Sequence, residues 1–225
     1  PFNGSTVQPF NRSTCLGNPV ATADSPSKES LIVDPDARLM VQVKDGDESA
    51  FEELVAKYQN RVLTVLYNAI GNREEAEDLT QDVFLRVYRA RHGYQPTAKF
   101  STWIFTITNN LAMNARRSRK HRRTVAIAAR ESGPLGARPQ EQLVEASGPT
   151  ASGQLQSSEV AEMVREAVAK LDDRQRMAVL LNKFEDLGYA EIAQIMDTTP
   201  TAIKSLLSRA RTNLREMLEP YLDVI

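Results

Sequence analysis

The sequence predicts an all-α fold, made of two small helical domains joined by a flexible linker. Apolar residues recur at helical spacing on both sides of a stretch rich in Gly, Pro and Ser, and no segment shows strand-like alternation. A hydrophobic content of 41% and a charged content of 25% are typical of a globular chain, and 225 residues suffice for two small domains. We expect a first domain over 36–120, a linker over 121–157 and a second domain over 158–225.

The N-terminal part of the chain combines an irregular stretch with two helical patterns. Residues 1–35 are rich in Pro, Ser, Thr, Asn and Gly without periodicity, which predicts a flexible extension. A short helix is expected from Asp36 and a longer one over 48–70. Asp47 or Ser49 can cap the longer helix, and Gly71 is expected to end it because glycine commonly follows a helix.

The next helix begins at Asn72, a good N-cap, with acidic side chains in its first turns that suit the positive end of the helix dipole. Its buried stripe is predicted to be Leu79, Val83, Phe84 and Val87. Leu85 and Gln81 lie among charged residues on the opposite side. Periodicity leaves two readings of that side open, a solvated face with one exposed leucine or a contact patch for a partner protein.

A further helix starts at Phe100 and carries the strongest nucleic-acid signal. Its expected core stripe is Phe100, Ile104, Ile107, Leu111 and Ala115. One flank holds Trp103, Thr106, Asn110, Asn114 and Arg117, and we expect Thr102, Asn109, Arg116 and Lys120 to continue that surface outward. An aromatic ring can stack on a base, amides can bond base edges, and guanidinium groups can bind phosphates.

The basic charge of the chain is concentrated at the end of this helix. From Asn109 to Arg130 there are seven Lys or Arg residues and no acid, although the chain as a whole has a net charge of -1. Each residue taken alone has a structural explanation, since a tryptophan is often core and an asparagine can be solvated. The run of basic residues favours a nucleic-acid surface.

Four helices are expected in the second domain, and the last two resemble a helix-turn-helix. Asp172 or Asp173 can cap the second helix, and Thr199 precedes Pro200 at the start of the last, where proline is favoured. The last helix has a predicted buried face of Ile203, Leu207, Ala210, Leu214 and Met217. Its open face is predicted to present Lys204, Ser205, Ser208, Arg209, Arg211 and Arg215 to the major groove of DNA.

Two stretches, EDLTQDVFLRVYRA and KFSTWIFTITNNLAMNARR, resemble region 2 of the extracytoplasmic-function sigma factors of the sigma-70 family. The stretch LDDRQRMAVLLNKFEDLGYAEIAQIM, followed by IKSLLSRAR, resembles region 4 of the same family. The chain departs from the region 4 pattern at Ala202 and Leu206, where members commonly have threonine and arginine. These departures put the usual preference for the upstream promoter element in doubt.

The resemblance implies an RNA polymerase sigma factor that binds core polymerase and directs promoter recognition, promoter opening and transcription initiation. The clamp of the largest subunit would bind Asp78, Gln81, Asp82, Leu85 and Arg86. The loop 91–99 and the following helix would hold the unpaired nontemplate strand of the minus-ten element. The implied minus-ten residues are Lys99, Trp103, Asn110, Asn114, Arg116, Arg117, Arg119 and Lys120.

The minus-thirty-five element would be read by Thr201, Lys204, Ser205, Ser208, Arg209 and Arg211. The resemblance implies the flap of the second-largest subunit as a further partner. It also makes an anti-sigma factor a plausible partner, and the sequence leaves open whether one exists. The linker would correspond to the segment threaded through the polymerase, although it carries no motif that we can match.

Other classes of function find less support in the sequence. Cys15, His92 and His121 have no metal-site spacing, and no nucleophile and base pair or phosphate-binding glycine loop is present, so we expect no enzyme, metal or cofactor. No long apolar run predicts membrane insertion, and sparse cysteine fits a cytoplasmic location. Two alternatives remain, a stand-alone helix-turn-helix regulator that binds duplex DNA and a helical adaptor that binds only proteins.

Overall fold

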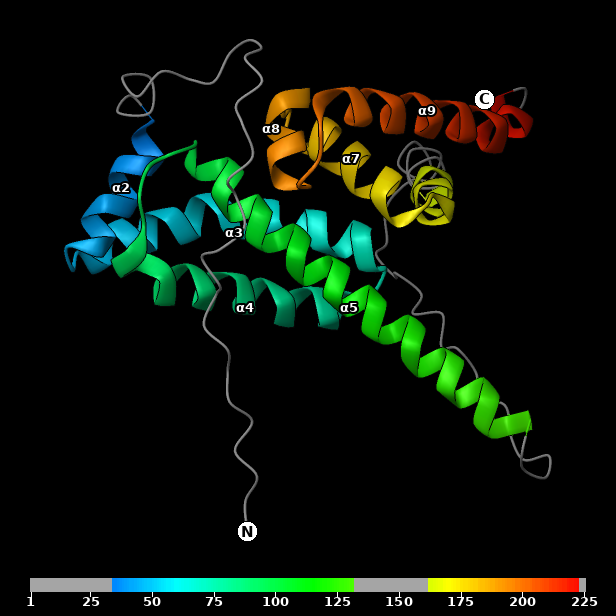
Figure 1. Ribbon diagram of the computed structural model, residues 1–225, viewed down its shortest axis with the longest axis horizontal. Helices are drawn as coiled ribbons and strands as arrows, with labels where there is room; N and C mark the ends of the chain where they lie inside the picture. Colours follow the sequence, from blue (N-terminus) through cyan, green and yellow to red (C-terminus); the bar gives the residue numbers. More distant parts are fainter. Residues whose placement is uncertain (1–33, 132–161, 223–225) are drawn as a thin grey trace, which may run out of the picture.

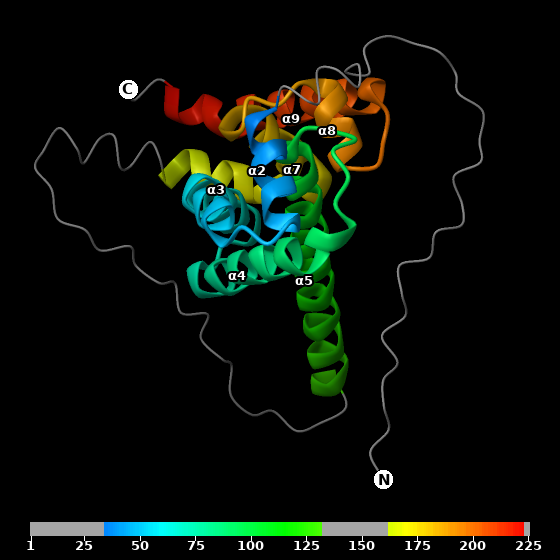
Figure 2. The same cartoon turned by 90° about the vertical axis from the view of Figure 1, so that its left-hand side faces the viewer.

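The computed structural model describes residues 34–131 and 162–222, and every regular element within these ranges is a helix. The helices of the first domain form a bundle, and the helices of the second domain lie across one side of it (Figures 1 and 2). The all-α prediction is therefore confirmed. Residues 1–33, most of the expected N-terminal extension, and much of the expected linker lie outside the described residues.

The first domain contains α2 (Pro35–Lys44), α3 (Glu48–Ile70), α4 (Arg73–Ala90), the short 3-10 helix η1 (Arg91–Gly93) and α5 (Phe100–Glu131). Its core is built around α3, which packs against α2, α4 and α5. Tyr58 lies at the centre, with its ring edge-on to Phe100 at 5.1 Å between centroids and to Phe105 at 6.5 Å. Such aromatic contacts stabilise a core beyond the area they bury.

Side-chain caps set the boundaries of these helices much as the sequence indicates. Asp47 accepts hydrogen bonds from the backbone of Ser49 and Ala50, and Asn72 accepts one from Glu75. Gly71 has a φ of 76°, a left-handed conformation that glycine adopts without a steric penalty. One boundary needs correction, because Asp34 caps α2 and the helix begins at Pro35, not at Asp36.

Asp34 and Asp36 also join the first helix to the rest of the bundle. The second carboxylate oxygen of Asp34 accepts a hydrogen bond from the backbone nitrogen of Phe100, so one residue caps both α2 and α5. Asp36 is buried and accepts hydrogen bonds from the Tyr58 hydroxyl at 2.6 Å and from Lys57 at 2.5 Å. Burial and the neighbouring Asp36 raise the pKa of Tyr58, so its hydroxyl stays a donor.

The second domain contains a helical segment over 162–170, then α7 (Asp173–Phe184), α8 (Tyr189–Ile195) and α9 (Pro200–Leu222). Asp172 caps α7, and Thr199 accepts a hydrogen bond from Ala202 at the start of α9. A tight turn with Asp197 at a φ of 49° connects α8 to α9. Ile203, Leu207 and Ala210 are buried as predicted, and Leu214 and Met217 are partly buried.

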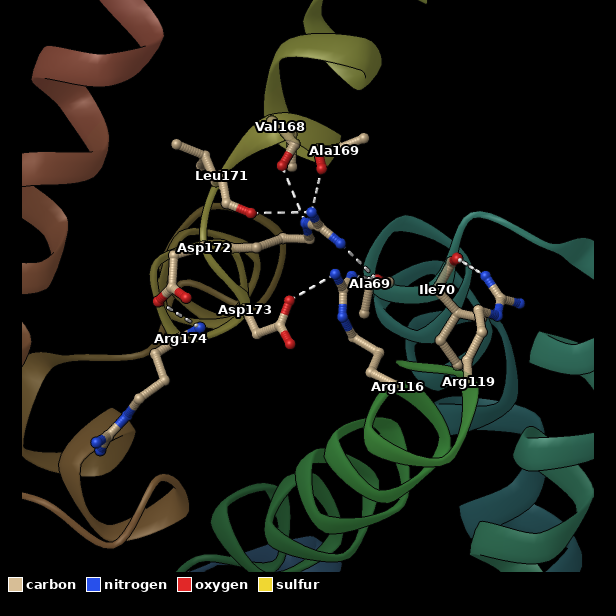
Figure 3. A network of polar contacts seen from close by, with 11 residues as sticks. Ala69, Ile70, Arg116, Arg119, Val168, Ala169, Leu171, Asp172, Asp173 and Arg174 are labelled. Carbon is tan, nitrogen blue, oxygen red and sulfur yellow. Dashed lines mark hydrogen bonds and ion pairs between the residues drawn. The ribbon is translucent and has the colours of Figure 1, made fainter. Parts of the chain in front are cut away.

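The two domains pack directly on each other, which the sequence did not predict. Helix α7 lies on α3, and α8 lies on α5. Arg176 of α7 is buried in this interface, where it donates hydrogen bonds to the carbonyls of Val168, Ala169 and Leu171 in its own domain and to Ala69 at the end of α3 (Figure 3). A single guanidinium group thus satisfies carbonyls of both domains.

The boundary between first domain and linker also differs from the prediction. Helix α5 continues to Glu131, past residue 121, where the linker was expected to begin. The sequence explains the extension, because 121–131 contains alanine and arginine and the first helix-breaking pair is Gly133 and Pro134. In both cartoon views the distal part of α5 projects away from the bundle (Figures 1 and 2).

We predict that Arg176→Met lowers the free energy of unfolding by about 2–3 kcal/mol, because the carbonyls of Ala69 and Leu171, one in each domain, each lose a hydrogen bond from the buried guanidinium group. The neighbouring Arg174 is exposed and provides the matched control. Arg174→Met should change the free energy by less than about 0.5 kcal/mol. Urea unfolding followed by circular dichroism measures both values, and equal stability of the two variants would contradict the prediction.

Candidate polymerase and nucleic-acid interfaces

The charged side of α4 forms an exposed surface with a leucine at its centre. Leu85 is 49% exposed, and Asp78, Gln81, Asp82 and Arg86 are all exposed around it. Val83, Phe84 and Val87 are buried on the opposite side, as predicted. The structure therefore places all five proposed polymerase-binding residues on one surface of the first domain, which we call the α4 surface.

The α4 surface continues into a groove of about 570 Å³ between α3 and α4. Leu85 and Gln81 lie on the α4 side of this groove, and Phe51 and Val55 lie on the α3 side, with Tyr88 packed against Phe51 at 5.1 Å between ring centroids. Glu48 and Glu52 add acidic groups to the lining. Phe51 and Val55 are only partly buried, although they lie at the helical spacing of the core residues of α3.

Four residues of the proposed minus-ten set project from the exposed side of α5. Asn110, Asn114, Arg117 and Lys120 are exposed, and the first three follow one another at helical spacing. This row offers amide donors and acceptors followed by a guanidinium group. Its chemistry suits contact with base edges and phosphates.

Trp103 lies near the start of α5 and is only partly exposed. Its ring packs against Tyr94 at 4.9 Å and Phe100 at 5.8 Å between centroids. Tyr94 is buried in the loop 94–99 that follows η1, and its backbone carbonyl accepts a hydrogen bond from Lys44. Trp103 therefore contributes to the core and leaves one part accessible beside the loop.

Three basic residues of the minus-ten set bond to other parts of the protein. Lys99 pairs with Glu191 of α8 at 2.9 Å, and Arg116 pairs with Asp173 of α7 at 2.5 Å. Arg119 pairs with Glu75. The guanidinium groups also donate to α3, Arg116 to the carbonyl of Ala69 and Arg119 to that of Ile70 (Figure 3).

The prediction that Thr102 and Asn109 extend the exposed surface is wrong. Both residues are buried, and α8 of the second domain packs against α5 at Asn109. Asn109 donates a long hydrogen bond of 3.4 Å to the carbonyl of Ile195 in α8, and its side-chain oxygen is buried without a protein partner. Helical periodicity could not reveal that another domain packs on this side of the helix.

Acidic residues of the second domain face basic residues on this side of the first domain. Burial opposes ionisation of Glu191, but hydrogen bonds from Lys99 and Gly188 hold its pKa below the usual value. The same pair raises the pKa of Lys99. Glu185 at the end of α7 is buried against Arg61 at 2.5 Å, and burial raises its pKa despite this partner. No sequence pattern indicated these pairings.

The exposed face of α9 matches the prediction closely. Every residue of the proposed minus-thirty-five set is exposed, namely Thr201, Lys204, Ser205, Ser208, Arg209 and Arg211. Leu206, one of the two departures from the region 4 pattern, is partly buried and packs against the core, as its position at the edge of the apolar stripe indicated. Ala202 is also partly buried. Neither residue adds a polar group to this face.

Comparison with known proteins identifies the class to which this fold and these surfaces belong. Residues 54–122 match sigma-70 region 2, and residues 161–214 match sigma-70 region 4. The ECF RNA polymerase sigma factor SigW of Bacillus subtilis strain 168 is 31% identical over 177 residues, which are 79% of this chain and 93% of that protein.

Two solved structures share the fold. CnrH, solved in complex with the cytosolic domain of CnrY, aligns with a TM-score of 0.61 and 21% identity over 83% of this chain and 99% of its own. The sigma factor RpoE, solved in complex with the anti-sigma factor NepR from Bartonella quintana, aligns with a TM-score of 0.54 and 20% identity over 75% and 96%. The chain belongs to the sigma-70 family, and within it to the extracytoplasmic-function RNA polymerase sigma factors, which direct promoter recognition.

None of the helices in the described residues combines the length and the apolar character needed to cross a bilayer. No group of three or more His, Cys, Asp or Glu side chains in these ranges has an arrangement suited to a metal ion.

We predict that the exposed amides and the tryptophan of α5 differ in their effect on stability. Asn110→Ala with Asn114→Ala should change the free energy of unfolding by less than about 0.5 kcal/mol, because both side chains are exposed. Trp103→Ala should lower it by about 2–3 kcal/mol, because its packing against Tyr94 and Phe100 is lost. Denaturant unfolding of the three proteins tests this, and a destabilised amide variant would contradict it.

Proposed function

We propose that this sigma factor uses three separate surfaces to start transcription. The α4 surface binds the clamp of the largest polymerase subunit, the exposed row of α5 holds the unpaired nontemplate strand at the minus-ten element, and α9 reads the minus-thirty-five element. The observation that carries the proposal is that one small domain presents both an exposed leucine among charges and a row of amides and arginine.

The α4 surface suits a protein partner because of its composition. Binding energy at protein interfaces usually comes from a few apolar or aromatic anchors surrounded by polar contacts. Leu85 can serve as such an anchor, and the adjoining groove offers apolar side chains of Phe51 and Val55 to a partner side chain. Asp78, Asp82 and Arg86 then fix orientation through charge.

The α5 surface suits an unpaired strand because it combines base and phosphate contacts. Asn110 and Asn114 can bond the edges of bases that have left the duplex, and Arg117 and Lys120 can bind the backbone beside them. Unstacking a base costs a few kcal/mol, so these contacts favour the open promoter by offsetting that cost. In this scheme the protein opens the promoter by binding the strands once they have separated. This requires no covalent chemistry, so the chain acts as a non-enzyme.

The second domain binds upstream duplex DNA and the flap of the second-largest subunit. Helix α9 presents Lys204, Arg209 and Arg211 for phosphates, with Thr201, Ser205 and Ser208 between them. Because Ala202 and Leu206 bring no polar contact, base readout upstream rests on the remaining residues. An anti-sigma factor is a further proposed partner, on the analogy of the RpoE complex with NepR. The polymerase partner implies a cytoplasmic location.

A stand-alone helix-turn-helix regulator explains fewer features of the molecule. It would use α9 in the same way, but it leaves the α4 surface and the amide row of α5 without a role. Such regulators commonly bind as dimers to two half-sites. An adaptor that binds only proteins leaves both basic surfaces without a role and predicts no salt-dependent binding to nucleic acid.

We predict that Leu85→Ala weakens binding to core polymerase about tenfold, because a central apolar anchor is lost. Val164→Ala is the matched control, since Val164 is also an exposed aliphatic residue but lies in the second domain. Fluorescence anisotropy of the labelled chain titrated with core polymerase gives both affinities. Equal affinities of the two variants would remove Leu85 from the interface.

We predict that adding this protein to core polymerase produces new transcription starts on genomic fragments of its source organism, sharing minus-ten and upstream motifs. Asn110→Ala with Asn114→Ala should reduce the yield at these starts by more than about tenfold, because each lost bidentate base contact is worth about 1–3 kcal/mol. Binding of this variant to core polymerase should be unchanged. No new starts and no comigration with polymerase would favour the stand-alone regulator.

A further inference from the structure

A cavity of about 500 Å³ lies between the two domains. Helix α5 forms one side of it from Asn109 to Lys120, and the start of α7 and Met196, which directly follows α8, form the other. Its volume is within the range of roughly 300–1,000 Å³ that is typical of small-molecule sites. Asn110 and Asn114, the exposed amides of α5, do not line it. The cavity is therefore distinct from the amide row of α5.

Asn109 lines this cavity and has a polar atom that the described part of the chain leaves without a partner. The residue is only 7% exposed, and its side-chain oxygen Oδ1 accepts no hydrogen bond from the described residues. The side-chain nitrogen donates to the carbonyl of Ile195, which fixes the orientation of the amide because the oxygen cannot donate. A buried acceptor without a donor is destabilising. A ligand with an N–H group could supply the missing donor.

The amide of Asn109 has the chemistry to read adenine. An asparagine bonds adenine in a bidentate manner, accepting from the 6-amino group and donating to N7. The second hydrogen of the Asn109 nitrogen is available for N7 while the first stays on Ile195. Met113 and Met196 also line the cavity, and these flexible, polarisable side chains can adapt to the faces of an aromatic base. Guanine and hypoxanthine would instead place an oxygen against Oδ1.

Basic groups occupy the remainder of the lining. Four cations and two carboxylates line the cavity, so the lining has a net charge of +2. Asp173 is paired with Arg116 at 2.5 Å (Figure 3). Arg117 and Arg174 are exposed, and no group in the described ranges bonds either guanidinium. Arg117 lies eight residues after Asn109, about 12 Å along the helix, a span that a nucleotide with a chain of phosphates can cover.

We propose that this cavity binds a free adenine nucleotide with two or more phosphates. Asn109 reads the base, which lies against Met113 and Met196, and the phosphates bind Arg117 and Arg174. An adenine of a DNA strand presents the same base edge. Two guanidinium groups without partners suit the several charges of a terminal diphosphate better than the single charge of each backbone phosphate, which favours the free nucleotide.

Isothermal titration calorimetry of the full chain tests the proposal with three probes, adenosine diphosphate, inosine diphosphate and pyrophosphate. Adenosine diphosphate should bind at one site. Inosine diphosphate should bind at least about tenfold more weakly, because its 6-oxygen replaces the amino group that donates to Asn109. Pyrophosphate should also bind more weakly, because it lacks the base. Equal binding of the two nucleotides, equal binding of pyrophosphate, or no binding of adenosine diphosphate would overturn the proposal.

A variant at the base-reading position tests the role of the amide. Asn109→Leu keeps a similar side-chain size and removes both polar groups. It should bind adenosine diphosphate about tenfold more weakly than the wild-type chain and should no longer distinguish it from inosine diphosphate. Thermal unfolding without nucleotide should show a folded protein, because the oxygen without a partner is gone. A folded variant that keeps the preference for adenine would overturn the assignment.

A second variant tests the phosphate contacts and does not depend on whether the fold tolerates leucine at position 109. Arg117→Gln with Arg174→Gln should weaken binding of adenosine diphosphate about tenfold, because two charge-assisted contacts are lost. The matched control is Arg89→Gln with Lys183→Gln, which removes the same charge from two exposed positions outside the cavity, one in each domain. Equal affinities of the two double variants would overturn the proposal.

A short single strand of deoxyadenosines, added as a competitor, distinguishes the two sources of adenine. Adenosine diphosphate should bind Asn109 more tightly than the strand does. A strand that binds more tightly, and loses affinity in Asn109→Leu, would assign the cavity to a DNA base and overturn the free nucleotide. The nucleotide site does not rest on the three surfaces proposed for polymerase and promoter DNA. Its failure leaves transcription starts that depend on Asn110 and Asn114 unaffected.

Discussion

The C-terminal end of α3 is the point on which the arrangement of the whole molecule depends. The last carbonyls of a helix have no partners within it and carry the negative end of the helix dipole. Here Ala69 accepts hydrogen bonds from Arg116 and Arg176, and Ile70 accepts one from Arg119 (Figure 3). Two of these arginines come from α5 and one from α7, so a single helix terminus holds α5 of the first domain and α7 of the second.

These hydrogen bonds at the end of α3 determine where the proposed binding surfaces lie. With α5 held at the end of α3, the amide row of Asn110 and Asn114 points away from the bundle, while α4 presents Leu85 elsewhere on the same domain. With α7 held at the same end, α8 lies on α5 and α9 keeps its basic face outward. The contacts between the two domains therefore include Lys99 and Arg116, two basic residues of the proposed minus-ten set.

Residues of the candidate site could be predicted from the sequence where their exposure follows the periodicity of a single helix. Leu85 on α4, Asn110 and Asn114 on α5 and the polar face of α9 all stand out because they interrupt or oppose an apolar stripe. Residues whose environment comes from another domain were not predictable in this way. Asn109 and Asn110 are adjacent asparagines of one helix, but Asn109 is buried. Arg116 and Arg117 are also adjacent, but Arg116 is bonded to Asp173 and to the carbonyl of Ala69.

The sequence by itself determined the all-α class, most helix boundaries and the residues that each helix buries or presents to its own domain. These features depend on caps, glycine conformations and apolar spacing, which act over a few residues along the chain. Only the tertiary structure decided that Glu185, Glu191 and Asp173 face Arg61, Lys99 and Arg116 across the domain boundary. Those partners are far apart in the sequence. The residues next to a charged side chain on a helix surface do not indicate whether it will face water or an opposite charge in the fold.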